Sequence, residues 1–180
     1  TNMSEINVEE WNFEGSALWN DYENTLELTP VETNQVGTAF NTIDTISGYQ
    51  AEIAFDFYIG DGSGADGLTF TALDVNRMTT FLGESGGGIG YGGLPGWTIE
   101  IDTYYNGGSD PTPDDHLAFT FDGNSSEYIL WSALPEMEDN GWHTIKIQVN
   151  APHIYVEVND FQTCLYDVVL SDDDGDQINV

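Results

Sequence analysis

The chain has 180 residues, enough for one domain that buries roughly two-thirds of its unfolded surface. Hydrophobic residues make up 39% of it, so a core can form and disorder is not expected. The formal net charge is −30, because 32 acidic residues face only Arg77 and Lys146. Such a surface repels nucleic acid and anionic membranes, so we expect neither as a partner. The single cysteine, Cys164, excludes an internal disulfide. No apolar run approaches the ~20 residues of a membrane span, so we expect no membrane insertion.

Short apolar stretches separated by turn residues run through the whole chain and predict strands. Residues 1–48 predict short strands and turns, without a helix of three turns. Residues 50–59 alternate apolar and polar side chains, as a half-buried strand does. Further strands are expected at 68–72, 97–105, 116–121, 142–149 and 153–158. Eight glycines in residues 83–96 are too many for a regular element. The pattern predicts an all-β sandwich that forms a single domain over residues 1–180.

Two carboxylates, Glu100 and Asp102, lie two residues apart on a predicted strand, so both side chains leave the same face. Neighbouring carboxylates repel each other unless a cation holds them, and basic residues are almost absent. A hard metal ion is therefore the expected partner. Further donors follow in a Gly- and Pro-rich loop that can fold back over the strand end: Asn106, Asp110 and His116. The residues alone predict a metal site that orders a loop, and an exposed acidic face is the alternative.

Two longer motifs stand in the sequence in a fixed order. The first is Ala65-Asp66-Gly67 followed by an apolar strand, and the second runs from Gly86 through a glycine-rich stretch and the acidic strand to His116. In this order they resemble the legume-type (L-type) lectin family, particularly its bacterial members, and the likeness extends from about residue 11 to the end. It implies a concanavalin A-like fold, which is a jelly-roll β-sandwich of two large antiparallel sheets. That fold agrees with the strand pattern.

The resemblance also implies two metal ions. A calcium ion would be bound by the Tyr104 carbonyl and three side chains, those of Asp102, Asn106 and Asp110. A second ion, usually manganese, would be bound by Glu100, Asp102, Asp110 and His116. Oxygen donors suit calcium and an imidazole among carboxylates suits manganese, with a second calcium as the other choice. The loop from Asp110 to His116 is one residue longer than in familiar members, a departure that affects the ligands of the second ion more than those of the calcium. A surface histidine beside acids is the alternative for His116.

The resemblance implies a sugar site beside the calcium, made by Asp66, Gly87, Gly88, Asn106 and Tyr104. Asp66 would accept hydrogen bonds from two sugar hydroxyls, and the family typically has a cis peptide bond after Ala65. In the glycine loop, residues 86–93, a backbone N–H of Gly87, or next of Gly88, would donate to a hydroxyl. Asn106 would turn its amide nitrogen to the sugar and its oxygen to calcium.

Each of these sugar-site residues also has a structural alternative. Asp66 could be an acidic turn residue, and the glycine loop could be a flexible spacer. Tyr104 or Tyr105 could stack on a pyranose ring or belong to the core. The sequence alone leaves these alternatives open.

Together these expectations describe a calcium-dependent lectin module that binds glycans without turning them over. Hydrolases of the same fold carry Glu-x-Asp-x-x-Glu, and Tyr105 stands at the position of the second glutamate, so the acid is missing. A module that calcium only stiffens is the other alternative. The acidity of the chain suggests an extracellular, secreted or cell-surface location, within a large bacterial surface adhesin whose other domains would be partners. Its main partners would be cell-surface or extracellular glycans.

The end of the sequence departs from the family. Further strands and a specificity loop follow the family's counterpart of residues 168–180, where this sequence stops. We therefore expect the last strands of the sandwich to come from a later segment or from another chain. An isolated 180-residue chain would then expose sheet edges and would aggregate or be marginally stable.

Overall fold

A computed structural model describes residues 6–159 and 165–169, so Cys164 and residues 170–180 lie outside the described part of the chain. Within it are two one-turn 3-10 helices, η1 (Val8–Glu10) and η2 (Gly86–Gly88), and no α-helix. The strands are β1 (Trp11–Gly15), β2 (Leu18–Asn20), β3 (Thr25–Glu27), β4 (Gly37–Asn41), β5 (Gln50–Tyr58), β6 (Gly67–Leu73), β7 (Gly96–Asp102), β8 (His116–Phe121), β9 (Leu130–Ala133), β10 (Trp142–Asn150), β11 (His153–Val158) and β12 (Leu165–Val169). Neither helix in the described ranges has the length that a membrane crossing requires.

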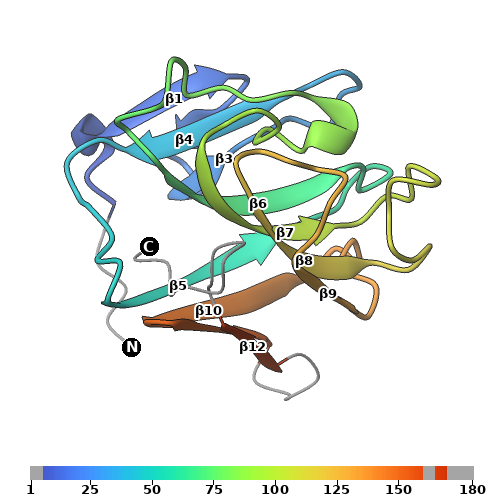
Figure 1. Cartoon of the computed structure of the whole chain (residues 1–180). Helices are drawn as coiled ribbons and strands as arrows, with labels where there is room; N and C mark the ends of the chain where they lie inside the picture. The colour runs from blue at the N-terminus through green and yellow to red at the C-terminus, as the bar shows by residue number, and fades with distance from the viewer. Residues whose placement is uncertain (1–5, 160–164, 170–180) are drawn as a thin grey trace.

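The strands form two four-stranded antiparallel sheets and two small hairpin-like sheets. One large sheet has the order β12-β11-β10-β5, the other has the order β6-β7-β8-β9, and β1 pairs with β4 and β2 with β3. Figure 1 shows β6 to β9 as one layer, with β5, β10 and β12 below it and β1, β3 and β4 above it. The prediction of an all-β antiparallel sandwich is confirmed.

The hydrophobic core lies between the two large sheets. Alternate residues of β10 and β11 point into it, as the period of two in a strand requires, and Ile147 and Ile154 are fully buried. From the facing sheet, Ile99 and Ile101 of β7 and Phe119 of β8 complete this core. Both faces of β7 are buried. The face that carries Glu100 and Asp102 is therefore covered by the layer on the other side of the sheet from the core.

The core is less well covered along β5 and β6, which end their sheets among the described residues. Apart from Phe57, their inward side chains are only part-buried, unlike most of those of β7, β8, β10 and β11: Ala51, Ile53, Phe55, Leu68, Phe70 and Ala72. All of these residues except Ala51 border a groove that continues to β4. Among the described residues, the sandwich is thus open on one side.

Two local predictions need correction. The strand predicted over 97–105 ends at Asp102, because the Asp102 carboxylate accepts a hydrogen bond from the Tyr104 N–H and begins a loop there. The glycine-rich stretch is not wholly irregular: it contains η2 and an antiparallel bridge between Glu84 and Gly92. The strands predicted at 116–121 and 153–158 are confirmed.

Candidate functional site

The acidic face of β7 is buried between its two neighbouring strands. The register places Thr69 of β6 opposite Glu100 and His116 of β8 opposite Asp102. Glu100 is 0%, His116 1% and Asp102 2% exposed. The alternatives of an exposed acidic face and a surface histidine are therefore wrong. The extra residue in the loop before His116 does not displace it, because the strand pairing sets its position.

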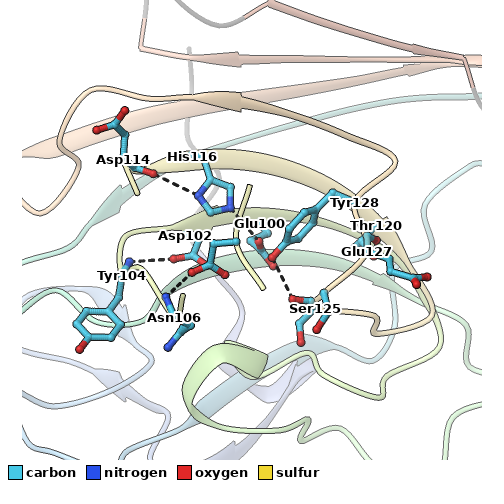
Figure 2. A network of polar contacts seen from close by, with 12 residues as sticks. Glu100, Asp102, Tyr104, Asn106, Asp114, His116, Thr120, Ser125, Glu127 and Tyr128 are labelled. Carbon is cyan, nitrogen blue, oxygen red and sulfur yellow. Dashed lines mark hydrogen bonds and ion pairs between the residues drawn. The ribbon is translucent and has the colours of Figure 1, made fainter. Parts of the chain in front are cut away.

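Glu100, Asp102 and His116 form a compact donor cluster, called the metal centre below, whose ligand atoms lie within 4.8 Å of one another. The His116 Nε2 atom lies 3.7 Å from Glu100 Oε1, too far for a hydrogen bond, and neither atom has a hydrogen-bond partner among the described residues. His116 Nδ1 lies 3.4 Å from the Asp114 carbonyl, which favours a proton on Nδ1 and a lone pair on Nε2 (Figure 2). Two buried, unpartnered donor atoms that face each other fit a metal ion well.

The electrostatics of the metal centre also suit the binding of a cation. Burial raises the pKa of Glu100 to about 8, although a hydrogen bond from Tyr91 opposes the change. Burial, with the nearby charges of Asp110 and Asp66, raises the pKa of Asp102 to about 7. Burial lowers the pKa of His116, which keeps its imidazole neutral and able to bind a metal. Without a cation, the site retains protons that a metal would displace.

The loop after β7 joins three of the predicted calcium ligands. The Asp102 Oδ1 atom accepts a hydrogen bond of 2.9 Å from the Tyr104 N–H, and the Asn106 N–H donates to Asp110 Oδ2. Asp110 is outside the compact cluster but close enough for its charge to raise the pKa of Asp102. The rings of Tyr104 and Tyr105 are 50% and 51% exposed, so neither tyrosine belongs to the core.

Asp66 is fixed against the end of β7 by its own backbone. The Ala65–Asp66 peptide bond is cis, as the resemblance implies. The Thr103 N–H donates to the Asp66 carbonyl at 3.0 Å, and the Thr103 hydroxyl donates to the Gly64 carbonyl at 2.6 Å. Asn106 Nδ2 donates to Asp66 Oδ1 at 3.3 Å. The carboxylate of Asp66 is therefore held beside the loop that follows β7, while Asp66 remains part-exposed.

The glycine loop lies on the other side of Asn106. A Cβ added to Gly87 would be 3.1 Å from Asn106 Oδ1, so the Gly87 backbone passes directly over this side chain. Gly87 is exposed, whereas Gly88 is buried and its N–H already donates to the Ser85 carbonyl. Internal hydrogen bonds shape the loop, including one of 3.0 Å from the Glu84 N–H to the Gly92 carbonyl. That order does not fit the flexible-spacer alternative.

Two tyrosines at the site were not predicted from the sequence. The Tyr91 hydroxyl donates a hydrogen bond of 2.5 Å to Glu100 Oε2, and the Tyr128 ring meets the His116 ring edge-on at a centroid distance of 5.8 Å. Tyr128 also donates to the Ser125 carbonyl (Figure 2). The available signal was the position of Tyr91, a large aromatic residue inside a loop otherwise rich in glycine. No pattern in the sequence distinguishes Tyr128.

No protein-family model matches the sequence. Among solved structures, the chain is similar to the Ca²⁺- and Man3GlcNAc-bound exoplasmic/lumenal domain of VIP36, with 15% identity, 89% of this chain and 70% of that chain covered, and a TM-score of 0.69. A lectin from Bauhinia forficata in complex with GalNAc matches with 18% identity, 89% and 77% coverage and a TM-score of 0.68. The metal-free carbohydrate recognition domain of Emp46p matches with 14% identity, 93% and 77% coverage and a TM-score of 0.65. The protein therefore has the fold of the L-type lectins.

Proposed function

We propose that this protein is a calcium-dependent carbohydrate-binding module. The observation that carries the proposal is the position of Asn106 between two candidate sugar contacts. Its amide nitrogen donates to Asp66 at 3.3 Å, and its oxygen lies under the backbone of Gly87. Asn106 thus lies where three features meet: the loop after β7, the Asp66 carboxylate and the backbone of Gly87. Asn106 and Gly87 are both exposed.

The proposed ligands divide between two ions. Calcium would be held by the Tyr104 carbonyl and by the side chains of Asp102, Asn106 and Asp110. A second ion, for which an imidazole among carboxylates favours manganese, would be held by the metal centre with Asp110. Bound cations would neutralise the buried carboxylates and order the loop that carries Asn106.

The protein's own residues would then recognise a sugar through hydrogen bonds. The Asp66 carboxylate accepts from two neighbouring hydroxyls, and the Gly87 N–H donates to a third group. Asn106 holds Asp66 in place and offers its remaining amide hydrogen. The half-exposed ring of Tyr104 is available to cover an apolar sugar face. Gly88 is buried beneath Gly87, so it supports the Gly87 backbone and is the second candidate for this contact.

Hydrolysis is not part of the proposal. A glycosidase needs two carboxyl groups that both reach the scissile bond, and Tyr105 stands where the second would be. Glu100, the first, is fully buried and accepts a hydrogen bond from Tyr91, so a sugar has no access to it. The similar solved structures named above include a lectin and a carbohydrate recognition domain. A calcium-stiffened module without sugar binding is less favoured, because Gly87 and Asn106 are exposed.

The setting of the module is also a proposal. VIP36 in the similar structures is an exoplasmic/lumenal domain with bound mannose oligosaccharide, and the Bauhinia lectin holds GalNAc. By analogy, and with a net charge of −30, we propose an extracellular or cell-surface module that binds glycans. Its motifs favour a bacterial surface adhesin, where several copies or domains would raise a weak single-site affinity through avidity.

Asp66→Asn tests the sugar site directly. The substitution removes the negative charge of Asp66 but keeps its size and its backbone hydrogen bond from Thr103. Binding of glycans on an array should weaken at least about tenfold, because a charge-assisted hydrogen bond is lost. The rise in melting temperature on adding calcium should persist, as measured by differential scanning fluorimetry.

Asp114→Asn is the matched control, since it removes the same charge from an exposed residue of the same surface. The Asp114 side chain contacts Thr112, and its link to His116 uses the backbone carbonyl, which the substitution keeps. Glycan binding should be unchanged in this variant. If Asp66→Asn binds glycans like the original protein, Asp66 is not a sugar ligand. If Asp66→Asn loses both glycan binding and the calcium-dependent melting shift, Asp66 has a structural role instead.

A further inference from the structure

Tyr91 is the buried connection between the glycine loop and the metal centre. It belongs to the loop by sequence, yet its side chain is 1% exposed and its hydroxyl lies 2.5 Å from Glu100 Oε2. One large side chain of the loop therefore points inward and contacts the Glu100 carboxylate. The other oxygen of this carboxylate, Oε1, faces His116.

The backbone around Tyr91 is held tightly to the rest of the loop. The Tyr91 N–H donates to the Gly88 carbonyl at 2.9 Å, and the Tyr91 carbonyl accepts from the Leu94 N–H at 2.8 Å. The side chain of Glu84 leaves no room for a Cβ at Gly88 or Gly92. A displacement of the Tyr91 ring would therefore carry the neighbouring glycines with it.

The surface end of the same loop reaches the candidate sugar site. Gly87 lies over Asn106, three residues after Glu84 and four before Tyr91. The loop therefore meets the candidate site at two points: at the surface, where Gly87 lies next to Asn106, and in the interior, where Tyr91 is hydrogen-bonded to Glu100. Only the interior point is a member of the metal centre's compact cluster.

A single carboxylate links the two sides of this arrangement. Glu100 Oε2 is used by Tyr91, while Oε1 has no hydrogen-bond partner among the described residues. A cation that binds Oε1 would fix the plane of the Glu100 carboxylate. It would thereby also fix the direction in which Oε2 accepts the hydrogen bond from the Tyr91 hydroxyl. An outer hydrogen bond of this kind orients a metal ligand, and the orientation works in both directions.

We infer that Tyr91 is a positioning residue that couples occupation of the metal centre to the position of the glycine loop. Its consequence for sugar binding rests on the proposed function, because Gly87 is a sugar contact only there. The coupling itself needs no sugar. The metal centre is thus connected to the candidate sugar site in two ways: through the loop after β7, which carries Asn106, and through Tyr91.

Tyr128 provides a matched control on the same carboxylate. Its ring meets the His116 ring edge-on at a centroid distance of 5.8 Å, so it lies beside the metal centre. It comes from the segment between β8 and β9, and its hydroxyl donates to Ser125 rather than to any residue of the glycine loop. Each of the substitutions Tyr91→Phe and Tyr128→Phe removes one tyrosine hydroxyl from the surroundings of the metal centre. Only Tyr91 belongs to the glycine loop.

The test is hydrogen exchange of the full chain, with Ca²⁺ present throughout and Mn²⁺ added or omitted. In the original protein, Mn²⁺ should slow exchange of the glycine-loop amides by about tenfold, a typical size for coupling between sites. It should also slow exchange in β8, which carries His116. In Tyr91→Phe, the slowing should persist in β8 and disappear from the glycine loop. In Tyr128→Phe, it should persist in both.

Equal slowing of the glycine loop in Tyr91→Phe and the original protein would overturn the inference. Absence of any Mn²⁺ effect on the loop of the original protein would overturn it too. Loss of the loop effect in Tyr128→Phe would show a general weakening of the centre rather than a connection through Tyr91. None of these readouts uses a glycan, so a failure of the proposed sugar binding would be recognised separately.

Discussion

At the scale of single residues, Asn106 connects the three parts of the candidate site. Its backbone N–H donates to Asp110, its amide nitrogen donates to Asp66, and its amide oxygen lies beneath Gly87. A side chain with one donor end and one acceptor end can serve a metal and a sugar at once. The position of the Asn106 side chain therefore depends on its three contacts, Asp110, Asp66 and Gly87.

Gly87→Ala should weaken glycan binding by about tenfold, roughly the effect of losing one well-placed hydrogen bond. The new methyl group would lie 3.1 Å from Asn106 Oδ1 and would displace either that side chain or an incoming sugar. Titration of array-positive glycans by isothermal calorimetry measures the change. Gly108→Ala is the control, since nothing lies within 4 Å of a Cβ there. Unchanged affinity in Gly87→Ala would remove Gly87 from the site.

The metal-free protein should lose stability as the pH rises. Burial raises the folded-state pKa of Glu100 to about 8 and of Asp102 to about 7. A raised folded-state pKa stabilises the fold fully below the unfolded-state pKa, and this contribution disappears as the pH passes through the folded-state value. Stability should therefore fall from about pH 5 to about pH 8, by on the order of 1 kcal/mol per pH unit for each group.

Urea denaturation in the presence of a chelator, repeated at each pH, measures this loss. Glu100→Gln should flatten the curve because its amide does not titrate. Excess metal should stabilise the protein more at pH 8 than at pH 5, since the ion competes with protons for the same ligands. A metal-free stability that increases between pH 5 and pH 8 would contradict the buried position of these carboxylates.

Residue types and spacing predicted the metal-ligating face of β7, and the resemblance to the L-type lectins predicted the sugar-site residues, but neither predicted how deeply the metal-ligating face is buried. The spacing of Glu100 and Asp102 indicated one shared face, which the strand pairing bears out. Nothing in the sequence showed that a further layer covers this face, so an exposed acidic strand remained open. The roles of Tyr91 and Tyr128 depend on long-range packing, which local patterns do not encode.

At the scale of elements, β7 carries the site because it is a central strand buried on both sides. Its apolar residues face the second large sheet, and its acidic residues face the layer that holds the glycine loop. The alternation along β5, β10 and β11 made these strands predictable. The end of β7 was not predictable, because a hydrogen bond that the Tyr104 N–H donates to the Asp102 carboxylate terminates the strand.

Ile147→Ala and Ile53→Ala should differ clearly in their cost, although the two residues are direct cross-strand partners. Ile147 of β10 is 0% exposed, so its truncation leaves a cavity and should destabilise the protein by about 2–5 kcal/mol. Ile53 of β5 is part-buried beside the open groove, so its truncation should cost less than half as much. Urea denaturation with metal present measures both. Equal costs would mean that β5 is covered as well as β10 in solution.

At the scale of the whole molecule, two features work against stability. A net charge of −30 repels itself, and this repulsion is relieved by bound cations or by salt. The side of the sandwich along β5 and β6 leaves apolar residues part-covered. The chain covers 70% of the VIP36 domain and 77% of the Bauhinia lectin chain. Among the described residues, both features therefore lower the stability of the fold, and bound cations relieve only the first of them.

The proposed module binds sugar only when calcium orders its surface, and a glycan array probed in calcium and again after addition of a chelator tests this dependence. We expect binding to a defined set of glycans in calcium and loss of that binding with the chelator, because Asn106 and Asp66 lose their support. Binding that persists unchanged in chelator would show that sugar binding does not depend on calcium. Absence of any bound glycan in calcium would instead favour a calcium-stiffened module without sugar binding.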